Sequence, residues 1–221
     1  MRRARLSGVL GGRSLPVGLA VLVLGLASGG EARARGVTSA PSDPWDELRR
    51  TDSALEAVLR RRVPDWSPEA DVVRGQVNAI LAGTLDYEEI ARRALDAEWS
   101  KLTSAEQRQF LRTFSALTNQ AFVSALTRPD LHFRLESEMV NGPIATVRVT
   151  AWGSRPARAG ERRIEYRLTQ KRDRWLIYDV LVDEVSLVDS YHDQFARLMR
   201  RGGFAELMDR MQHKVEVTGR Y

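Results

Sequence analysis

The chain contains no cysteine, and this absence excludes several kinds of site. Disulfides, thiol nucleophiles and cysteine metal ligands are impossible, and no lipid can be attached at a cysteine after a signal sequence. Small exported domains commonly rely on disulfides, but a domain of this length can bury enough apolar surface without them. The fold must therefore depend on its hydrophobic core.

Common catalytic and nucleotide-binding motifs are also missing. The sequence has no G-x-S-x-G, P-loop or G-x-G-x-x-G motif. His132, His192 and His213 lack metal-ligand spacing and occupy polar positions, so we expect exposed histidines and no metal site. A carboxylate at the mouth of a cone-shaped α+β domain could be a general base, but no partner residue is evident. The sequence therefore favours a protein that is not an enzyme and has no cofactor.

Five acidic residues gather near the end of the chain's last strand pattern: Asp179, Asp183, Glu184, Asp189 and Asp193. Arginines are abundant throughout the same region, and carboxylates are favoured at the starts of helices. We interpret the cluster as helix caps and solvated ion-pair partners rather than as catalytic groups.

No hydrophobic run is long enough to span a bilayer comfortably. Val17–Ala27 has only eleven apolar residues, whereas a transmembrane helix needs about 20. This run follows several arginines and precedes Ala32-Arg33-Ala34, which resembles a signal-peptide cleavage site. We therefore expect residues 1–34 to be a signal peptide, 35–43 a linker, and 44–221 a single domain.

Positive charge is concentrated in the predicted signal peptide. The whole chain has a net charge of +5, of which residues 1–34 contribute +4 through five arginines and one glutamate. The remaining chain is thus almost neutral, at +1. Nucleic-acid binding requires a basic patch or stripe, so we expect no nucleic-acid partner.

The first half of the expected domain has the periodicity of helices. Helical patterns cover residues 44–62, 67–82, 86–95 and 104–127. Ser67-Pro68 predicts a helix start, and Asp86-x-x-Glu89 and Thr103-x-x-Glu106 have the form of capping boxes. The last helical pattern has a wide apolar stripe that includes Phe110, Phe114, Leu117 and Phe122.

The second half has the two-residue period of strands. Apolar residues of the first strand are Leu131, Phe133, Leu135 and Met139, which alternate with His132, Arg134, Glu136 and Glu138. Strand patterns follow at 145–152, 163–169 and 175–182, the first of them after the turn signal Asn141-Gly142. Ser186-x-x-Asp189 then predicts the start of a helix that breaks at Gly202-Gly203. These patterns predict an α+β domain in which a four-stranded antiparallel curved sheet packs against several helices.

The second strand has only small residues on its apolar face, namely Ala145, Val147, Val149 and Ala151. Such a face opposite a wide helix leaves volume unless aromatic side chains fill it. Two interpretations remain at this point, an ordinary packed core and an apolar cavity between sheet and helices.

Several spaced motifs resemble the MlaC family of periplasmic phospholipid carriers, also known as toluene-tolerance or ABC-transporter auxiliary proteins. The helical half contributes Asp86-Tyr87, Ala91, Leu95, Trp99, Thr103, Gln107-Arg108, Phe110, Phe114, Leu117, Phe122 and Leu126. The strand half contributes Tyr166-Arg167-Leu168, Trp175–Val180, Val185–Val188, Tyr191 and Gln194-Phe195. The resemblance covers roughly residues 70–212. It departs at Asp96 and Glu184, where the family often has glycine, and at His192, where arginine is common.

The resemblance implies a soluble, monomeric periplasmic protein that shuttles phospholipid between the membranes and supports outer-membrane lipid asymmetry. Implied partners are phospholipid acyl chains, an inner-membrane ABC transporter complex with MCE-domain proteins, and an outer-membrane lipoprotein complex. The acyl chains would lie against Phe114, Leu117, Phe122, Val147, Val149, Tyr166, Leu168, Ile177, Val188 and Tyr191. Two alternatives are a periplasmic adaptor without lipid cargo and a carrier of another lipid, such as a hopanoid or sterol.

Overall fold

The computed structural model describes residues 43–218 except 61–62, 64–66, 127–130 and 154–160. The predicted signal peptide and all but the last residue of the linker lie outside the described residues. The helical half comprises α1 (Pro44–Leu59), α2 (Pro68–Ala82), α3 (Tyr87–Leu95), the 3-10 helix η2 (Asp96–Lys101) and α4 (Ser104–Leu126). The second half comprises β1 (Leu131–Asn141), β2 (Ile144–Gly153), β3 (Arg162–Lys171), β4 (Arg174–Val182), β5 (Val185–Ser186) and α5 (Leu187–Thr218).

The predicted helix starts are confirmed by side-chain caps. The Ser67 hydroxyl accepts a hydrogen bond from the backbone of α2. Thr103 and Glu106 form both bonds of a capping box, at 3.3 and 2.8 Å. Asp86 accepts from the Glu89 N–H at 3.2 Å, but the Glu89 carboxylate pairs with two arginines of α3 instead of completing the box. Local polar signals thus set where these helices begin.

The predicted α+β class is confirmed, but the sheet has five strands rather than four. All neighbouring strands are antiparallel, in the order β1-β2-β3-β4-β5, and the sheet is not closed. The fifth strand arises because Asp183 and Glu184 both adopt positive φ, at 47° and 72°. This pair makes a two-residue hairpin that pairs Val185 with Val182. The chain therefore returns along β4 before α5 begins.

A bulge in β1 reverses the expected facing of its last residues. Leu135 pairs with Val149, but the next pairing joins Ser137 to Arg148, so one residue is extra on β1. Met139, predicted to face the core, is 53% exposed. Glu138, predicted to face solvent, lies opposite the fully buried Val147. A shift of one residue in a strand exchanges its two faces.

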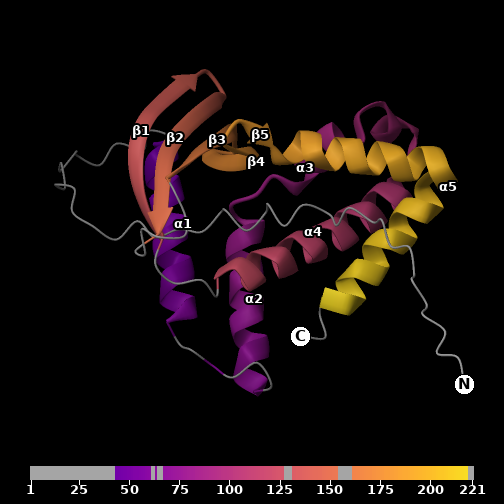
Figure 1. Cartoon of the computed structure of the whole chain (residues 1–221), viewed down its shortest axis with the longest axis horizontal. Coiled ribbons are helices and arrows are strands. Elements are labelled where there is room, and N and C mark those ends of the chain that lie inside the picture. Colours follow the sequence, from indigo (N-terminus) through magenta and orange to yellow (C-terminus); the bar gives the residue numbers. More distant parts are fainter. Residues whose placement is uncertain (1–42, 61–62, 64–66, 127–130, 154–160, 219–221) are drawn as a thin grey trace, which may run out of the picture.

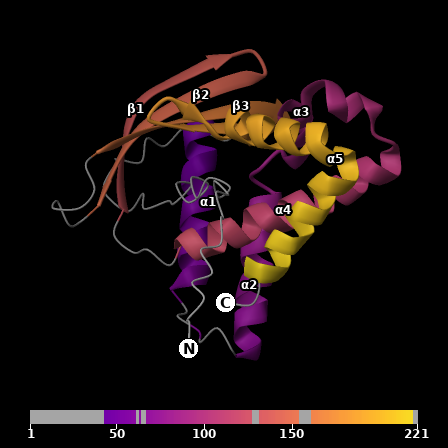
Figure 2. The same ribbon diagram turned by 45° about the vertical axis from the view of Figure 1, so that its right-hand side comes forward.

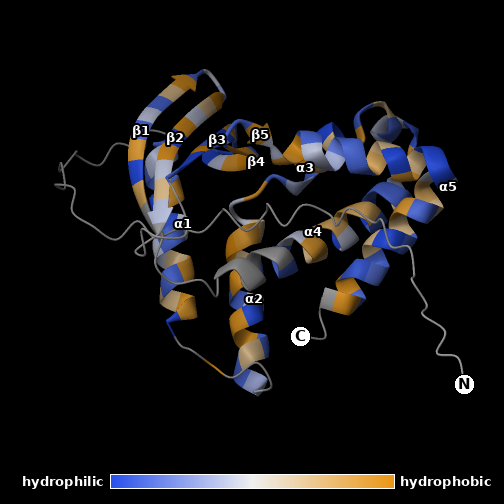
Figure 3. Cartoon of the chain, viewed as in Figure 1, coloured by the Kyte–Doolittle hydropathy of each residue, from blue (hydrophilic) through white to orange (hydrophobic). Residues whose placement is uncertain are grey.

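The helices cover one face of the sheet (Figures 1 and 2). α1 contacts β2 and β4 and also packs beside α2, whereas α3 and α5 lie against β4. Figure 3 shows the alternation of hydrophobic and hydrophilic residues along the strands, which lets one face join the core. α5 is kinked at Gly202 and Gly203, as predicted, because both residues leave helical geometry. None of the described helices is long and apolar enough to cross a membrane.

The two positions where the sequence has an acidic residue in place of the family's frequent glycine both have positive φ. Asp96 ends α3 at φ 47° and ψ −125°, and Glu184 lies in the β4–β5 hairpin at φ 72°. Glycine adopts these conformations without the steric clash that a Cβ causes. The backbone at both positions would therefore suit glycine.

We expect Asp96→Gly and Glu184→Gly each to raise the free energy of unfolding by about 1 kcal/mol. The control is Asp209→Gly on the exposed side of α5, which should instead lower it by about 0.3 kcal/mol, because glycine is a somewhat poorer helix former than aspartate. Urea unfolding of the three variants beside the parent measures these differences. Destabilisation at positions 96 and 184 comparable to that at 209 would contradict the strain argument.

Candidate functional site

A small apolar pocket lies where β4 meets α3, α4 and α5. Its volume is about 40 Å³, far below the roughly 300–1,000 Å³ of typical small-ligand sites. It is lined by Leu85, Ile90, Phe114, Thr118, Ile177, Tyr178, Asp179, Val180, Leu187, Val188 and Tyr191. The space that these residues enclose is too small for an acyl chain, so this pocket of the described residues does not show the predicted apolar cavity.

Aromatic rings of α4 and α5 form the helical side of the pocket. Phe114 stacks on Phe110, with ring centroids 5.5 Å apart, and meets the edge of Tyr191 at 5.3 Å. Phe195 completes the cluster and lies 5.5 Å from both Phe110 and Tyr191. Edge-to-face and offset contacts of this kind add stability beyond the burial of area. The cluster joins α4 to α5 and supplies one wall of the pocket.

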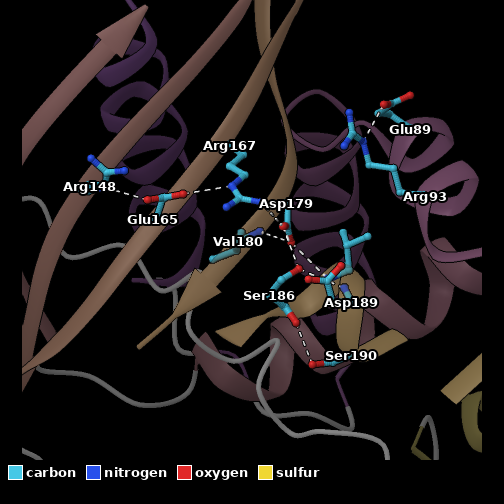
Figure 4. Close-up of polar contacts among 11 residues, drawn as sticks. Glu89, Arg93, Arg148, Glu165, Arg167, Asp179, Val180, Ser186, Asp189 and Ser190 are labelled. Atoms are coloured by element: carbon cyan, nitrogen blue, oxygen red, sulfur yellow. Dashed lines mark hydrogen bonds and ion pairs between the residues drawn. The ribbon is translucent and has the colours of Figure 1, made fainter. Parts of the chain in front are cut away.

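The opposite wall is anchored by the carboxylate of Asp179, which is 5% exposed (Figure 4). Asp179 accepts hydrogen bonds from the Ser186 hydroxyl at 2.8 Å and from the Val188 N–H at 3.2 Å. It also accepts from the Val180 N–H at 2.9 Å. Ser186 in turn accepts from the Asp189 N–H at 3.0 Å, as its predicted role of N-cap requires. Asp179 and Ser186 together hold the first turn of α5 against β4.

Asp179 also ends a row of charges that crosses the sheet. Arg148 of β2 pairs with Glu165 of β3 at 2.7 Å, Glu165 pairs with Arg167 at 3.0 Å, and Arg167 lies 3.5 Å from Asp179. The pKa of Glu165 is lowered because its hydrogen bonds and ion pairs with the two arginines outweigh its desolvation. Because the oxygens of Asp179 are committed to these donors, the pocket offers an incoming molecule mainly apolar contacts.

The prediction of solvated ion-pair partners is correct for Asp183 and Glu184, and the expected solvation is wrong for Asp179. Asp183 pairs with Arg162 at 2.7 Å, and Glu184 pairs with Arg163 at 3.2 Å. The hydrogen bond from Arg162 holds the pKa of Asp183 below its usual value. Asp179 is buried rather than solvated, because it takes the donors of the α5 terminus and of its own strand. Asp179 lies within the apolar run Trp175–Val182, and this run was the one sequence signal of its burial.

Two tyrosine hydroxyls are neutral within the core. Burial raises the pKa of Tyr191 well above its ordinary value. The pKa of Tyr166 is also raised, mainly by burial and to a smaller extent by the negative charge of Asp52. A buried phenol that stays protonated adds no charge to its surroundings, so both rings remain compatible with apolar contacts.

The structure divides the ten predicted tail-binding residues into separate groups. Four line the small pocket, namely Phe114, Ile177, Val188 and Tyr191. Four more are buried on the inner face of β2 and β3, namely Val147, Val149, Tyr166 and Leu168. Leu117 is buried on α4, and the side chain of Phe122 lies outside the described residues. The strand β2 packs beside α1, and its small side chains belong to the same buried core cluster as Phe110 and Phe114.

Sequence reasoning missed most of the remaining pocket lining. Tyr178 and Val180 belong to the nearly continuous apolar run of β4, and such a run is a usable signal that both faces of a strand are buried. Leu85 was not recognisable, because it follows a helix end and joins β4 only through a bridge to Ile177. Ile90 and Thr118 reach the pocket from α3 and α4 through tertiary packing. Outside the pocket, the guanidinium of Arg93 stacks over the ring of Tyr178 at 4.3 Å.

Comparisons with known proteins assign the chain to a family. The family model described as MlaC protein matches residues 51–213, and among curated proteins no relative matches. A solved structure of the phospholipid-binding protein from Ralstonia solanacearum, in complex with a phospholipid, is similar with a TM-score of 0.65 and 18% identity. The match covers 80% of this chain and 99% of that chain, and at this identity it shows a shared fold. Because the family model covers well over half of the 221 residues, the chain belongs to the MlaC family.

Proposed function

We propose that this protein is a periplasmic carrier that binds phospholipid by its acyl chains, between the sheet and the helices. The observation that carries this proposal is the family match over residues 51–213, together with a shared fold whose solved example holds a phospholipid. Residues 1–34 would direct export, and residues 44–221 would form the single carrier domain. The cargo would move between an outer-membrane lipoprotein complex and an inner-membrane ABC transporter complex with MCE-domain proteins.

The physical need for a carrier is large. Transfer of two acyl chains of about 16 carbons from a bilayer into water costs roughly 25 kcal/mol of free energy, at about 0.8 kcal/mol per CH₂. A carrier must replace most of that energy with apolar contacts while it leaves the headgroup in water, since burying an unpaired charged group is costly. No catalytic step is needed, and the protein would act by binding alone.

The tail-binding site proposed here consists of the small pocket and the apolar face beside it. The pocket supplies Phe114, Ile177, Val188 and Tyr191, and the face of β2 and β3 supplies Val147, Val149, Tyr166 and Leu168. A pocket of about 40 Å³ cannot accept an acyl chain unless the sheet and helices separate. Loading therefore requires movement between the layers, and the mainly small residues on β2 leave little side-chain volume to displace.

Native mass spectrometry of the mature protein purified gently from a bacterial host tests this proposal. We expect a bound species whose mass equals one or more phospholipids and which dissociates into phospholipid on activation. Lipid extraction followed by mass analysis would identify a hopanoid or sterol cargo if either replaces phospholipid. A consistently unliganded protein that also fails to take up phospholipid from vesicles would overturn the carrier proposal. That result would favour the periplasmic adaptor instead.

A further inference from the structure

The bulge in β1 carries a carboxyl group to the covered face of the sheet. Glu138 lies opposite Val147, and Val147 is fully buried. The neighbouring Glu136 remains on the outer face, where it accepts from the Thr150 hydroxyl at 2.9 Å and pairs with Arg134 at 3.0 Å. Two acids of one strand, separated by a single residue, therefore have opposite surroundings.

Glu138 meets the N-terminus of α1. The backbone N–H of Trp45 donates to Glu138 Oε1 at 3.0 Å and also to Asp43 Oδ1 at 3.0 Å. Asp43 is the N-cap of α1, and its side chain also accepts from the Asp46 N–H. Two carboxyl groups from distant parts of the chain thus share one donor. The contact ties the β1–β2 hairpin to α1.

The charges around Glu138 are mainly negative. Asp43 and Asp46 approach it from α1, while Arg49 is engaged with Asp46 at 3.3 Å. From the sheet, its partner Val147 is apolar. Arg134 and Arg148, the nearest strand cations in sequence, are paired with Glu136 and Glu165. In the described part of the chain, no ion pair joins Glu138 to a lysine or arginine.

Two carboxyl groups in this position are stable together when they hold one proton. The protonated group can then donate to the other, whereas two carboxylates repel each other. The pKa of Glu138 is raised to about 7, by desolvation first and then by the hydrogen bond and charge of Asp43 and the charge of Asp46. The Trp45 N–H opposes this shift.

We propose that Glu138 keeps its proton beside Asp43 and thereby clasps the β1–β2 hairpin to α1, and that loss of this proton loosens the hairpin over the tail-binding face. The link to lipid rests on the proposed function, because the hairpin contains Val147 and Val149. The pKa of Glu138 is higher in the folded protein than its ordinary value of 4.5, so the protonated group stabilises the fold. This stabilisation is fully present below about pH 4.5. That stability decreases as the pH rises to about 7 and does not return above it.

Hydrogen exchange of the full mature chain at about pH 5.5 and about pH 8 tests the clasp, after correction for intrinsic exchange rates. We expect protection factors of amides in residues 131–153 to fall about three- to tenfold at the higher pH, because local opening follows the ionisation of the pair. Glu138→Gln keeps an oxygen acceptor for Trp45 and should remove most of this pH dependence. Glu136→Gln, on the outer face of the same strand, should leave it unchanged.

Equal pH dependence in the parent and in Glu138→Gln would overturn the clasp. A second measurement follows the release of a fluorescent-tailed phosphatidylglycerol from the protein to vesicles at both pH values. We expect faster release at the higher pH in the parent and in Glu136→Gln, but not in Glu138→Gln. If this lipid does not bind at either pH, the proposed function fails, while the protection factors still decide the clasp. In a further outcome, the protection factors of the hairpin depend on pH while the lipid release rates are equal in all three proteins. That combination would contradict the proposal that the hairpin controls lipid release.

Discussion

The Asp179→Ala variant is expected to lose about 3 kcal/mol of the free energy of unfolding. Asp179 is the buried acceptor for the Ser186 hydroxyl and for the N–H groups of Val180 and Val188. Alanine would leave these donors without their partner in a region that excludes water, at a cost of about 1–3 kcal/mol for an unsatisfied group. The Arg167 side chain is 40% exposed and can be hydrated instead, so its lost ion pair adds little.

Two further variants make this prediction specific. Asp179→Asn keeps one oxygen acceptor and should lose less than alanine. Asp193→Ala removes an exposed acid from the same helix and should change the stability by less than about 0.5 kcal/mol. Denaturant unfolding followed by circular dichroism measures all three. If Asp179→Ala unfolds like Asp193→Ala, the carboxylate does not hold α5 against the sheet.

The Val188→Phe variant is expected to bind phospholipid about five- to a hundredfold more weakly, since overpacking costs roughly 1–3 kcal/mol and about 1.4 kcal/mol is a tenfold change in affinity. Val188 is 6% exposed and lines the pocket of about 40 Å³. A phenyl ring would occupy this space and compete with an acyl chain for the contacts of Phe114 and Tyr191. The measurement is the fraction of lipid-bound protein by native mass spectrometry after equal exposure to vesicles.

Val185→Phe is the matched control, because it adds the same ring three residues earlier at a position that is 61% exposed. We expect it to retain lipid. Thermal unfolding of both variants shows whether each is folded. Loss of lipid by Val188→Phe indicates a blocked site only if this variant is folded. Lipid binding by folded Val188→Phe at the parental level would show that the tails do not use this pocket.

Much of the fold was predictable because its signals are local. Ser67, Thr103 and Ser186 mark helix starts through side-chain hydrogen bonds from the residue three positions further along the chain. The break at Gly202 and Gly203 follows in the same way from the conformations that glycine permits. Helices, strands and their order could therefore be predicted before any long-range contact was known.

The candidate site was predictable only in part. Burial was correctly expected for residues such as Val149 and Leu168, because alternation in a strand predicts which face joins the core. The pocket itself also depends on Leu85 and Ile90, whose positions follow from the packing of a loop and a helix against β4. The tail-binding role of these residues remains a prediction.

By itself, the sequence determined the α+β class, the helix starts, the turns of the β1–β2 and β3–β4 hairpins and the absence of thiol chemistry, because each depends on residue types or on spacing along the chain. The fifth strand follows from a local turn at Asp183 and Glu184, which the sequence did not reveal because neither residue is glycine. Tertiary structure decided the bulge in β1, the burial of Asp179 and the small size of the pocket. Those features depend on register and packing between distant segments, such as Glu138 with Trp45 or Asp179 with Val188. A carboxylate has the same appearance in the sequence whether it faces water or the start of a helix, and only its neighbours in space determine its role.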